Sequence, residues 1–151
     1  MSATNYHRWH SPVAGTIVRA FVVEGTYYSE ADSEGADAVE PMNSQSYLAH
    51  VAARAVILIQ ADDPVIGLMA FVAVGMSEVS SCLIDSKVAS GYHVGKGEEL
   101  GYFQYGGSTH CLVFRPGAIA DFALATIPQP HDPNAPLVLV RSKLATASTA
   151  V

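Results

Sequence analysis

Residues 102–110 have the sequence YFQYGGSTH, in which a Gly-Gly-Ser-Thr turn separates two apolar segments. Glycine tolerates positive φ, so the backbone before Ser108 can turn sharply and leaves the Gly107 carbonyl open to attack. Ser108 and Thr109 place two hydroxyls beside that carbonyl. The turn suits acyl chemistry on the chain itself, and a hairpin turn capped by hydroxyls is the alternative.

The segments around this turn are short, apolar and rich in β-branched residues. We predict strands over residues 16–23, 55–59, 79–84, 111–114 and 137–140, and one or two strands within 65–76. Residues 48–55 are rich in alanine and can form one or two helical turns. Short strands joined by glycine turns indicate a mainly β fold, a sandwich- or barrel-like hybrid of antiparallel strands with little helix.

The length and hydropathy of the chain favour one domain over residues 1–151, because 151 residues can bury a sizeable core. Half of the residues (50%) are hydrophobic and the mean hydropathy is +0.24. Such values point to extensive buried strand or to an oligomer interface, so a homo-oligomer stays open. The acidic residues 29–40 and the proline-rich residues 128–136 are predicted as loops, and the tail after residue 140 as mobile.

The charge and cysteine content exclude several classes of partner. A net charge of −6 gives no basic patch for nucleic acid or anionic lipid. Cys82 and Cys111 are far apart and form no chelating motif, so we expect no metal site and a reducing compartment. No apolar run is long enough for a membrane span, and the N-terminus is too polar for a signal peptide. We therefore expect a cytoplasmic protein without a stable membrane anchor.

Three segments together resemble the phosphatidylserine decarboxylase family: YHRWHSP at residues 6–12, VAVGMSEV at 72–79, and KGEELGYF at 96–103, which leads into the Gly-Ser-Thr of 107–109. Their order and spacing match, and the resemblance covers nearly the whole chain. Within the family, the chain is similar to the soluble fungal branch that includes aromatic amino acid decarboxylases such as the L-tryptophan enzyme.

The resemblance implies a carboxy-lyase whose cofactor is made from the chain. The Ser108 hydroxyl would attack the Gly107 carbonyl to give an ester, and elimination would cleave the chain into residues 1–107 and 108–151, with a pyruvoyl group at position 108. That group condenses with the amine of the substrate and accepts the electrons released with CO₂. By the same resemblance, His10 is the base for self-cleavage and His7 serves decarboxylation. The implied substrate is a soluble amino acid, with an aromatic one as a candidate.

Other polar residues near the turn have smaller expected roles. Gly106, Thr109 and His110 would line the site, and the Thr109 N–H is a candidate oxyanion donor. Histidines are more often ordinary core or surface residues, and this interpretation is favoured for the three that lie outside the motifs: His50, His93 and His131.

Two alternatives stay open. The family pairs its base with an upstream aspartate that this chain does not contain, and six residues are candidate substitutes: Asp32, Asp37, Asp62, Asp63, Asp85 and Asp121. Without a substitute the chain would stay uncleaved and lack pyruvoyl, and it would serve as a small-molecule-binding or partner subunit or in a cofactor-free reaction. The second alternative is a lipoyl-like carrier module, for which Lys87 is an imperfect match.

Overall fold

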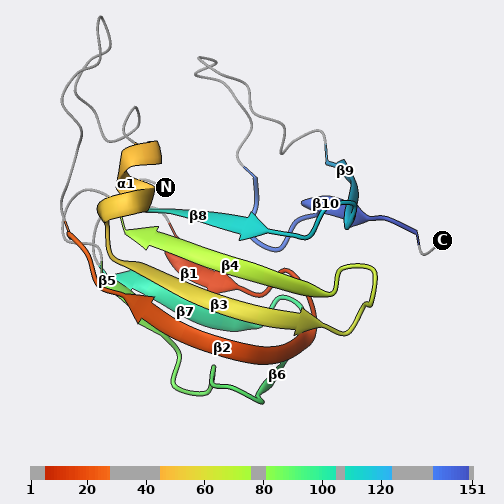
Figure 1. The fold of residues 1–151 in the computed structure, drawn as a ribbon, viewed down its shortest axis with the longest axis horizontal. Helices are drawn as coiled ribbons and strands as arrows, with labels where there is room; N and C mark the ends of the chain where they lie inside the picture. Colours follow the sequence, from red (N-terminus) through yellow and green to blue (C-terminus); the bar gives the residue numbers. More distant parts are fainter. Residues whose placement is uncertain (1–5, 28–44, 76–80, 105–107, 124–137, 150–151) are drawn as a thin grey trace, which may run out of the picture.

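The computed structural model describes residues 6–27, 45–75, 81–104, 108–123 and 138–149. Within these ranges nearly all regular structure is antiparallel β (Figure 1), as the sequence predicted. The elements in chain order are β1 (Arg8–His10), β2 (Gly15–Val23), α1 (Gln45–Val51), β3 (Arg54–Ala61), β4 (Leu68–Gly75), β5 (Ser81–Ile84), β6 (His93–Val94), β7 (Glu99–Gln104), β8 (Ser108–Val113), β9 (Ile119–Phe122) and β10 (Ala145–Ala147).

The strands form a five-stranded sheet in the order β6-β2-β3-β4-β8, a three-stranded sheet in the order β1-β7-β5, and a two-stranded sheet of β10 and β9. In the largest sheet, side chains alternate between a buried face and a more exposed one, as the period of a strand requires. Ile57 and Ile59 on β3 are completely buried, and Phe71 on β4 is 2% exposed. The buried face therefore makes one wall of the core.

Trp9 joins the two larger sheets. Its ring centroid lies 4.9 Å from that of Phe103 on β7, in its own sheet, and 6.0 Å from that of Phe71 on the facing sheet. The side chain is only 2% exposed. Edge-on and tilted aromatic pairs at these separations add stability beyond the area they bury. The tryptophan of the YHRWHSP motif is therefore a core residue that locks β1 in place.

Gly101 on β7 makes room for that tryptophan. It has φ of +155°, and a Cβ there would lie 2.2 Å from the Leu83 carbonyl oxygen and 2.8 Å from the Trp9 ring. Both distances are far inside van der Waals contact, and the carbonyl belongs to paired backbone on β5 that cannot move freely. The second glycine of the KGEELG segment is thus required by packing.

Replacement of Gly101 by Ala is expected to destabilise the fold by about 3 kcal/mol, because overpacking and backbone strain act together. Gly91→Ala is the matched control, since Gly91 also has a positive φ, +88°, but a Cβ there would meet nothing within 4 Å. The control is expected to lose about 1–2 kcal/mol from strain alone. Urea unfolding measures both, and equal losses would contradict the packing argument.

The C-terminal part of the chain differs from the prediction. The strand predicted over residues 137–140 is wrong for its described part, because residues 138–140 are irregular and exposed. The predicted mobile tail instead contains β10, which pairs with β9 and continues that ladder where the Ala123 N–H donates to the Leu144 carbonyl at 2.9 Å. Strand formation here depends on an available partner edge, which β9 supplies.

The remaining sequence predictions divide into confirmed and untested ones. The predicted helical turns appear as α1, and the run at 65–76 forms one strand, β4. The proline-rich loop and the acidic loop both fall outside the described residues. No helix in the described ranges has the length and hydropathy needed to cross a bilayer.

Candidate functional site

Ser108 lies at the point where the chain passes from one sheet to the other. It is the first residue of β8, where it pairs with Gly75 of β4, while the preceding strand β7 belongs to the three-stranded sheet. The two strands around the Gly-Gly-Ser-Thr segment are therefore not a hairpin. The Ser108 side chain is completely buried, and Ser11 is the other buried polar residue in the described ranges. Gly106 and Gly107 lie outside the described residues.

The YHRWHSP segment contains β1, which runs antiparallel to β7. Its two histidines, His7 and His10, therefore lie at different ends of β7. The Phe103 N–H donates to the His7 carbonyl at 3.0 Å, and the His7 ring meets the Phe103 ring edge-on at 6.1 Å. His10 instead lies opposite Glu99, at the start of β7. At about 3.3 Å per residue, Glu99 and the last residue of β7 are roughly 16 Å apart. His7 is thus at the end that leads to Ser108, and His10 is at the far end.

Both ring nitrogens of His10 have partners. Nδ1 lies 2.9 Å from the Gly97 carbonyl oxygen, and Nε2 lies 2.7 Å from the Tyr6 hydroxyl. The Arg141 guanidinium lies 3.4 Å from Nδ1. Of the two Nδ1 contacts, the one to Gly97 is the shorter. A carbonyl can only accept, so we assign the proton to Nδ1, and Nε2 then accepts from the Tyr6 hydroxyl. These contacts do not include Ser108.

His110 shares with Ser108 the face of β8 that turns toward the core, because residues two apart on a strand face the same side. Its ring stacks on Phe71 with the centroids 5.4 Å apart. The side chain is otherwise exposed, but desolvation of the stacked ring lowers the pKa of His110 and favours a neutral imidazole. Thr109 is half-buried on the opposite face. Of the predicted lining residues that are described, His110 is therefore the one on the Ser108 side.

None of the described aspartates contacts His10. Three of them bond within their own surroundings: Asp62 to the His93 ring, Asp63 to the Val65 N–H, and Asp85 to the Lys87 N–H. Asp121 lies on β9, whereas Asp32 and Asp37 lie outside the described residues. Within the described part of the chain, the Nδ1 partner of His10 is thus a backbone carbonyl rather than a carboxylate.

Glu98, in the KGEELG segment, was not singled out from the sequence, yet it organises the turn beside His10. Its carboxylate accepts from Lys87 Nζ at 2.8 Å, from the Tyr92 hydroxyl at 2.5 Å and from the Gly95 N–H at 2.8 Å. These donors, the lysine first, lower the pKa of Glu98 from 4.5 to about 2. The sequence signal was its place inside a specific motif; the three donors are visible only in the structure.

The turn around Glu98 is expected to loosen in acid. Because the folded pKa is depressed, this carboxylate stabilises the turn above its ordinary value of 4.5, and that stabilisation is lost as the pH falls toward about 2. The Gly95 amide proton resonance, followed by NMR between these limits, should move with the titration of Glu98. Glu98→Gln should remove this response, and a variant that retained it would contradict the assignment.

The other histidines and Lys87 have ordinary structural settings. His93 pairs with Asp62, and His50 is exposed on α1. His131 lies outside the described residues. The Lys87 ammonium is engaged by Glu98, which raises the pKa of that ammonium, so the structure does not favour the carrier alternative. The described residues contain no cluster of metal ligands.

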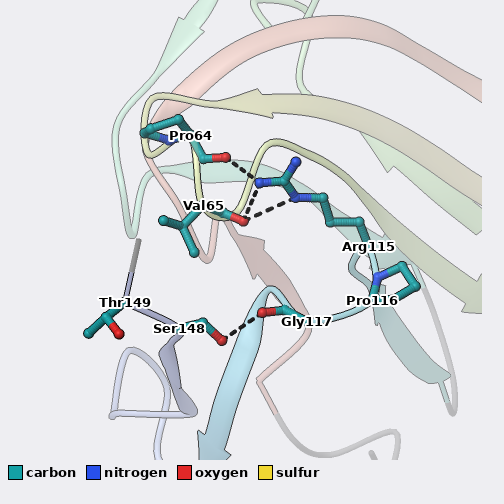
Figure 2. A pocket seen from close by; sticks show the side chains of 7 residues that line it. All are labelled: Pro64, Val65, Arg115, Pro116, Gly117, Ser148 and Thr149. Atoms are coloured by element: carbon teal, nitrogen blue, oxygen red, sulfur yellow. Dashed lines mark hydrogen bonds between the residues drawn. The ribbon is translucent and has the colours of Figure 1, made fainter. Parts of the chain in front are cut away.

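A hollow of about 610 Å³ lies at the opposite end of β8 from Ser108. Figure 2 shows its seven lining residues: Pro64, Val65, Arg115, Pro116, Gly117, Ser148 and Thr149. The Arg115 guanidinium points back at the Pro64 and Val65 carbonyls, and Ser148 donates to the Gly117 carbonyl (Figure 2). The Arg115 guanidinium therefore holds the β3–β4 loop in place, and its function here is structural.

Known proteins resemble this chain along most of its length. A family model described as phosphatidylserine decarboxylase matches residues 1–129. Decarboxylase iboD of Amanita muscaria is 45% identical over 133 residues, which cover 81% of this chain and 37% of that protein. L-tryptophan decarboxylase of Psilocybe cubensis is 41% identical over 123 residues, which cover 76% of this chain and 28% of that protein.

A third relative is phosphatidylserine decarboxylase proenzyme 3 of Schizosaccharomyces pombe, which is 37% identical over 116 residues, 77% of this chain and 11% of that protein. The chain therefore spans little more than a third, at most, of the length of these three relatives. The matched region includes both the YHRWHSP and the KGEELG segments. The resemblance inferred from these segments is confirmed, and the chain belongs to the phosphatidylserine decarboxylase family.

Proposed function

We propose that this chain carries the self-cleavage site of a pyruvoyl-dependent carboxy-lyase that acts on a soluble amino acid, with an aromatic one as the leading candidate. The observation that carries the proposal is Ser108, a completely buried serine at the crossover between the two sheets. Burial keeps position 108 away from water, which protects the reactive intermediates that form when a cofactor is made from the chain. The aromatic substrate class rests on the L-tryptophan decarboxylase relatives.

The proposed cleavage has three steps: ester formation, elimination and hydrolysis. The Ser108 oxygen adds to the Gly107 carbonyl as a base takes the hydroxyl proton, and the peptide bond is exchanged for an ester. Loss of the α-proton of residue 108 then breaks the ester, which leaves Gly107 as a carboxylate and residue 108 as dehydroalanine. Hydrolysis of the dehydroalanine releases ammonia. We assign the first proton transfer to His10 and the proton transfers of decarboxylation to His7, as the family resemblance implies.

The residues present suit a group formed at position 108. When present, a pyruvoyl group supplies a carbonyl that accepts the electrons released with CO₂. Ser108 holds that position inside the core, and His110 presents a neutral imidazole on the same face of β8. His7 adds a second imidazole at the adjoining end of β7, with its ring fixed against Phe103. These side chains can exclude water and move a proton near position 108.

Intact-mass spectrometry of the purified chain tests the proposal. Self-cleavage gives two species that correspond to residues 1–107 and 108–151, and the second has a blocked N-terminus. A mass spectrum that shows only the full chain after prolonged incubation would contradict self-cleavage for this chain. A second candidate function would then be favoured, that of an uncleaved binding or partner subunit, because the Nδ1 partner of His10 in the described residues is a carbonyl rather than a carboxylate.

A further inference from the structure

A continuous row of ring contacts links the two larger sheets. Its members are, in order, His7, Phe103, Trp9, Phe71 and His110. Successive ring centroids lie 6.1, 4.9, 6.0 and 5.4 Å apart. The three inner residues are at most 5% exposed, whereas His7 is partly exposed and His110 is exposed. A ligand can therefore reach this row at its two imidazole ends and not in its middle.

The rings at the two ends are held differently. The His7 ring meets Phe103 edge-on, with an interplanar angle of 86°, whereas the His110 ring stacks on Phe71 with the planes 14° apart. A stacked ring has a second face, parallel to the first, on the side away from its partner. His110 is also exposed and lies on β8, the edge strand of the five-stranded sheet (Figure 1). It thus presents a flat aromatic surface that a buried ring supports from behind.

The backbone of β8 fixes the distance between His110 and position 108. Both residues pair with β4, Ser108 with Gly75 and His110 with Ala73. Residues two apart on a strand lie on the same face, about 7 Å from each other. The side chain of an aromatic amino acid spans a similar distance between its amino group and the far side of its ring. A substrate whose amino group lies at position 108 can therefore place its ring against His110.

The chemistry of the His110 side chain favours a substrate with an aromatic ring. Parallel, offset rings attract each other beyond the area that they bury. Desolvation lowers the pKa of His110, and a neutral imidazole keeps one nitrogen that accepts from an indole N–H or a phenol O–H. An aliphatic side chain offers neither a ring face nor such a donor.

We propose that His110 is a specificity-determining residue, whose exposed ring stacks on the side-chain ring of the substrate and so selects aromatic over aliphatic amino acids. The consequence for decarboxylation rests on the proposed function, whereas the contact with the ring can be measured without it. His7, at the other end of the row, has a different task, since its ring is assigned to proton transfer.

NMR of the histidine-labelled full chain tests the contact with two amines, tryptamine and isoamylamine, which are the decarboxylation products of L-tryptophan and L-leucine. His110→Phe identifies the His110 signals. Tryptamine is expected to move the carbon-bound ring protons of His110 upfield, because a stacked ring shields them, and isoamylamine should leave them in place. Signals of His110 that tryptamine leaves unchanged, or that both amines move alike, overturn the inference.

Three variants measure how much the ring contributes. In His110→Leu, which removes the ring and keeps an apolar side chain, calorimetry should show tryptamine binding weakened about three- to tenfold, the range expected for one aromatic contact, and isoamylamine binding unchanged. His110→Phe restores a ring and should recover most of the loss. Cys111→Leu places the same new side chain on the opposite face of β8 and should change neither affinity.

The outcomes separate this inference from the proposed function. In a chain that cleaves itself, kcat/KM for L-tryptophan should fall in His110→Leu by the same factor as the affinity for tryptamine. Equal losses for the two amines, or a His110→Phe variant as weak as His110→Leu, overturn the role of the ring even if cleavage occurs. If mass spectrometry shows that the chain is never cleaved, the proposed function fails, and the two titrations still decide the inference.

Discussion

Ser108→Ala is expected to abolish self-cleavage of this chain completely. The variant removes the only oxygen that can attack the Gly107 carbonyl from position 108, and no neighbouring group can form the same five-membered ring. The loss of one buried oxygen leaves the packing of β8 against β4 almost unchanged, so the variant should stay folded. Intact-mass spectrometry should show only the full chain, and release of CO₂ from amino acids should be absent.

Ser11→Ala is the matched control for Ser108→Ala, since Ser11 is the other buried polar residue among those described and its hydroxyl donates to the Val13 carbonyl. This control should lose about 1 kcal/mol of stability and keep cleavage. Cleavage that survives in Ser108→Ala would show that another residue is the nucleophile. Release of CO₂ by an uncleaved Ser108→Ala chain would exclude a cofactor made from Ser108.

His10→Asn is expected to slow self-cleavage by about 10²- to 10⁴-fold, the usual contribution of a positioned general base. Asparagine can still donate to the Gly97 carbonyl, but it has no basic nitrogen. His7→Asn should leave cleavage nearly intact and remove decarboxylation, since His7 is assigned to the second reaction. The rates of appearance of the two fragments and of CO₂ release measure the two steps separately.

The pair of histidine variants also tests a feature that the sequence could not show. The register of β1 on β7 places His7, and not His10, at the end of β7 that leads to Ser108. If His7→Asn blocks cleavage and His10→Asn does not, the roles implied by the resemblance are exchanged in this chain. If neither variant slows cleavage, another base acts, and His110 on the Ser108 face of β8 becomes the next candidate to replace.

The sequence by itself determined the mainly β fold, the family, and five of the ten strands in the described residues, namely β2, β3, β4, β5 and β8. The strand patterns at β2, β3 and β5 follow from runs of β-branched and apolar residues, a local property that packing then confirms. The family followed from the YHRWHSP, KGEELG and Gly-Ser-Thr motifs, whose residues have different structural roles. Trp9 fills the core, Gly101 makes room for it, and Ser108 occupies the buried crossover.

Only the tertiary structure decided how these parts meet, because each contact joins residues that are distant in sequence. Strand pairing showed that β7 and β8 lie in different sheets, and it placed the two histidines at opposite ends of β7. Near residue 140 the predicted strand is absent from the described residues 138–140. The strand that forms in this region is β10, because β9 offers it a free edge. The partner of His10 was equally hidden, since a backbone carbonyl such as that of Gly97 has no signature in a sequence, and its direction is set by the turn.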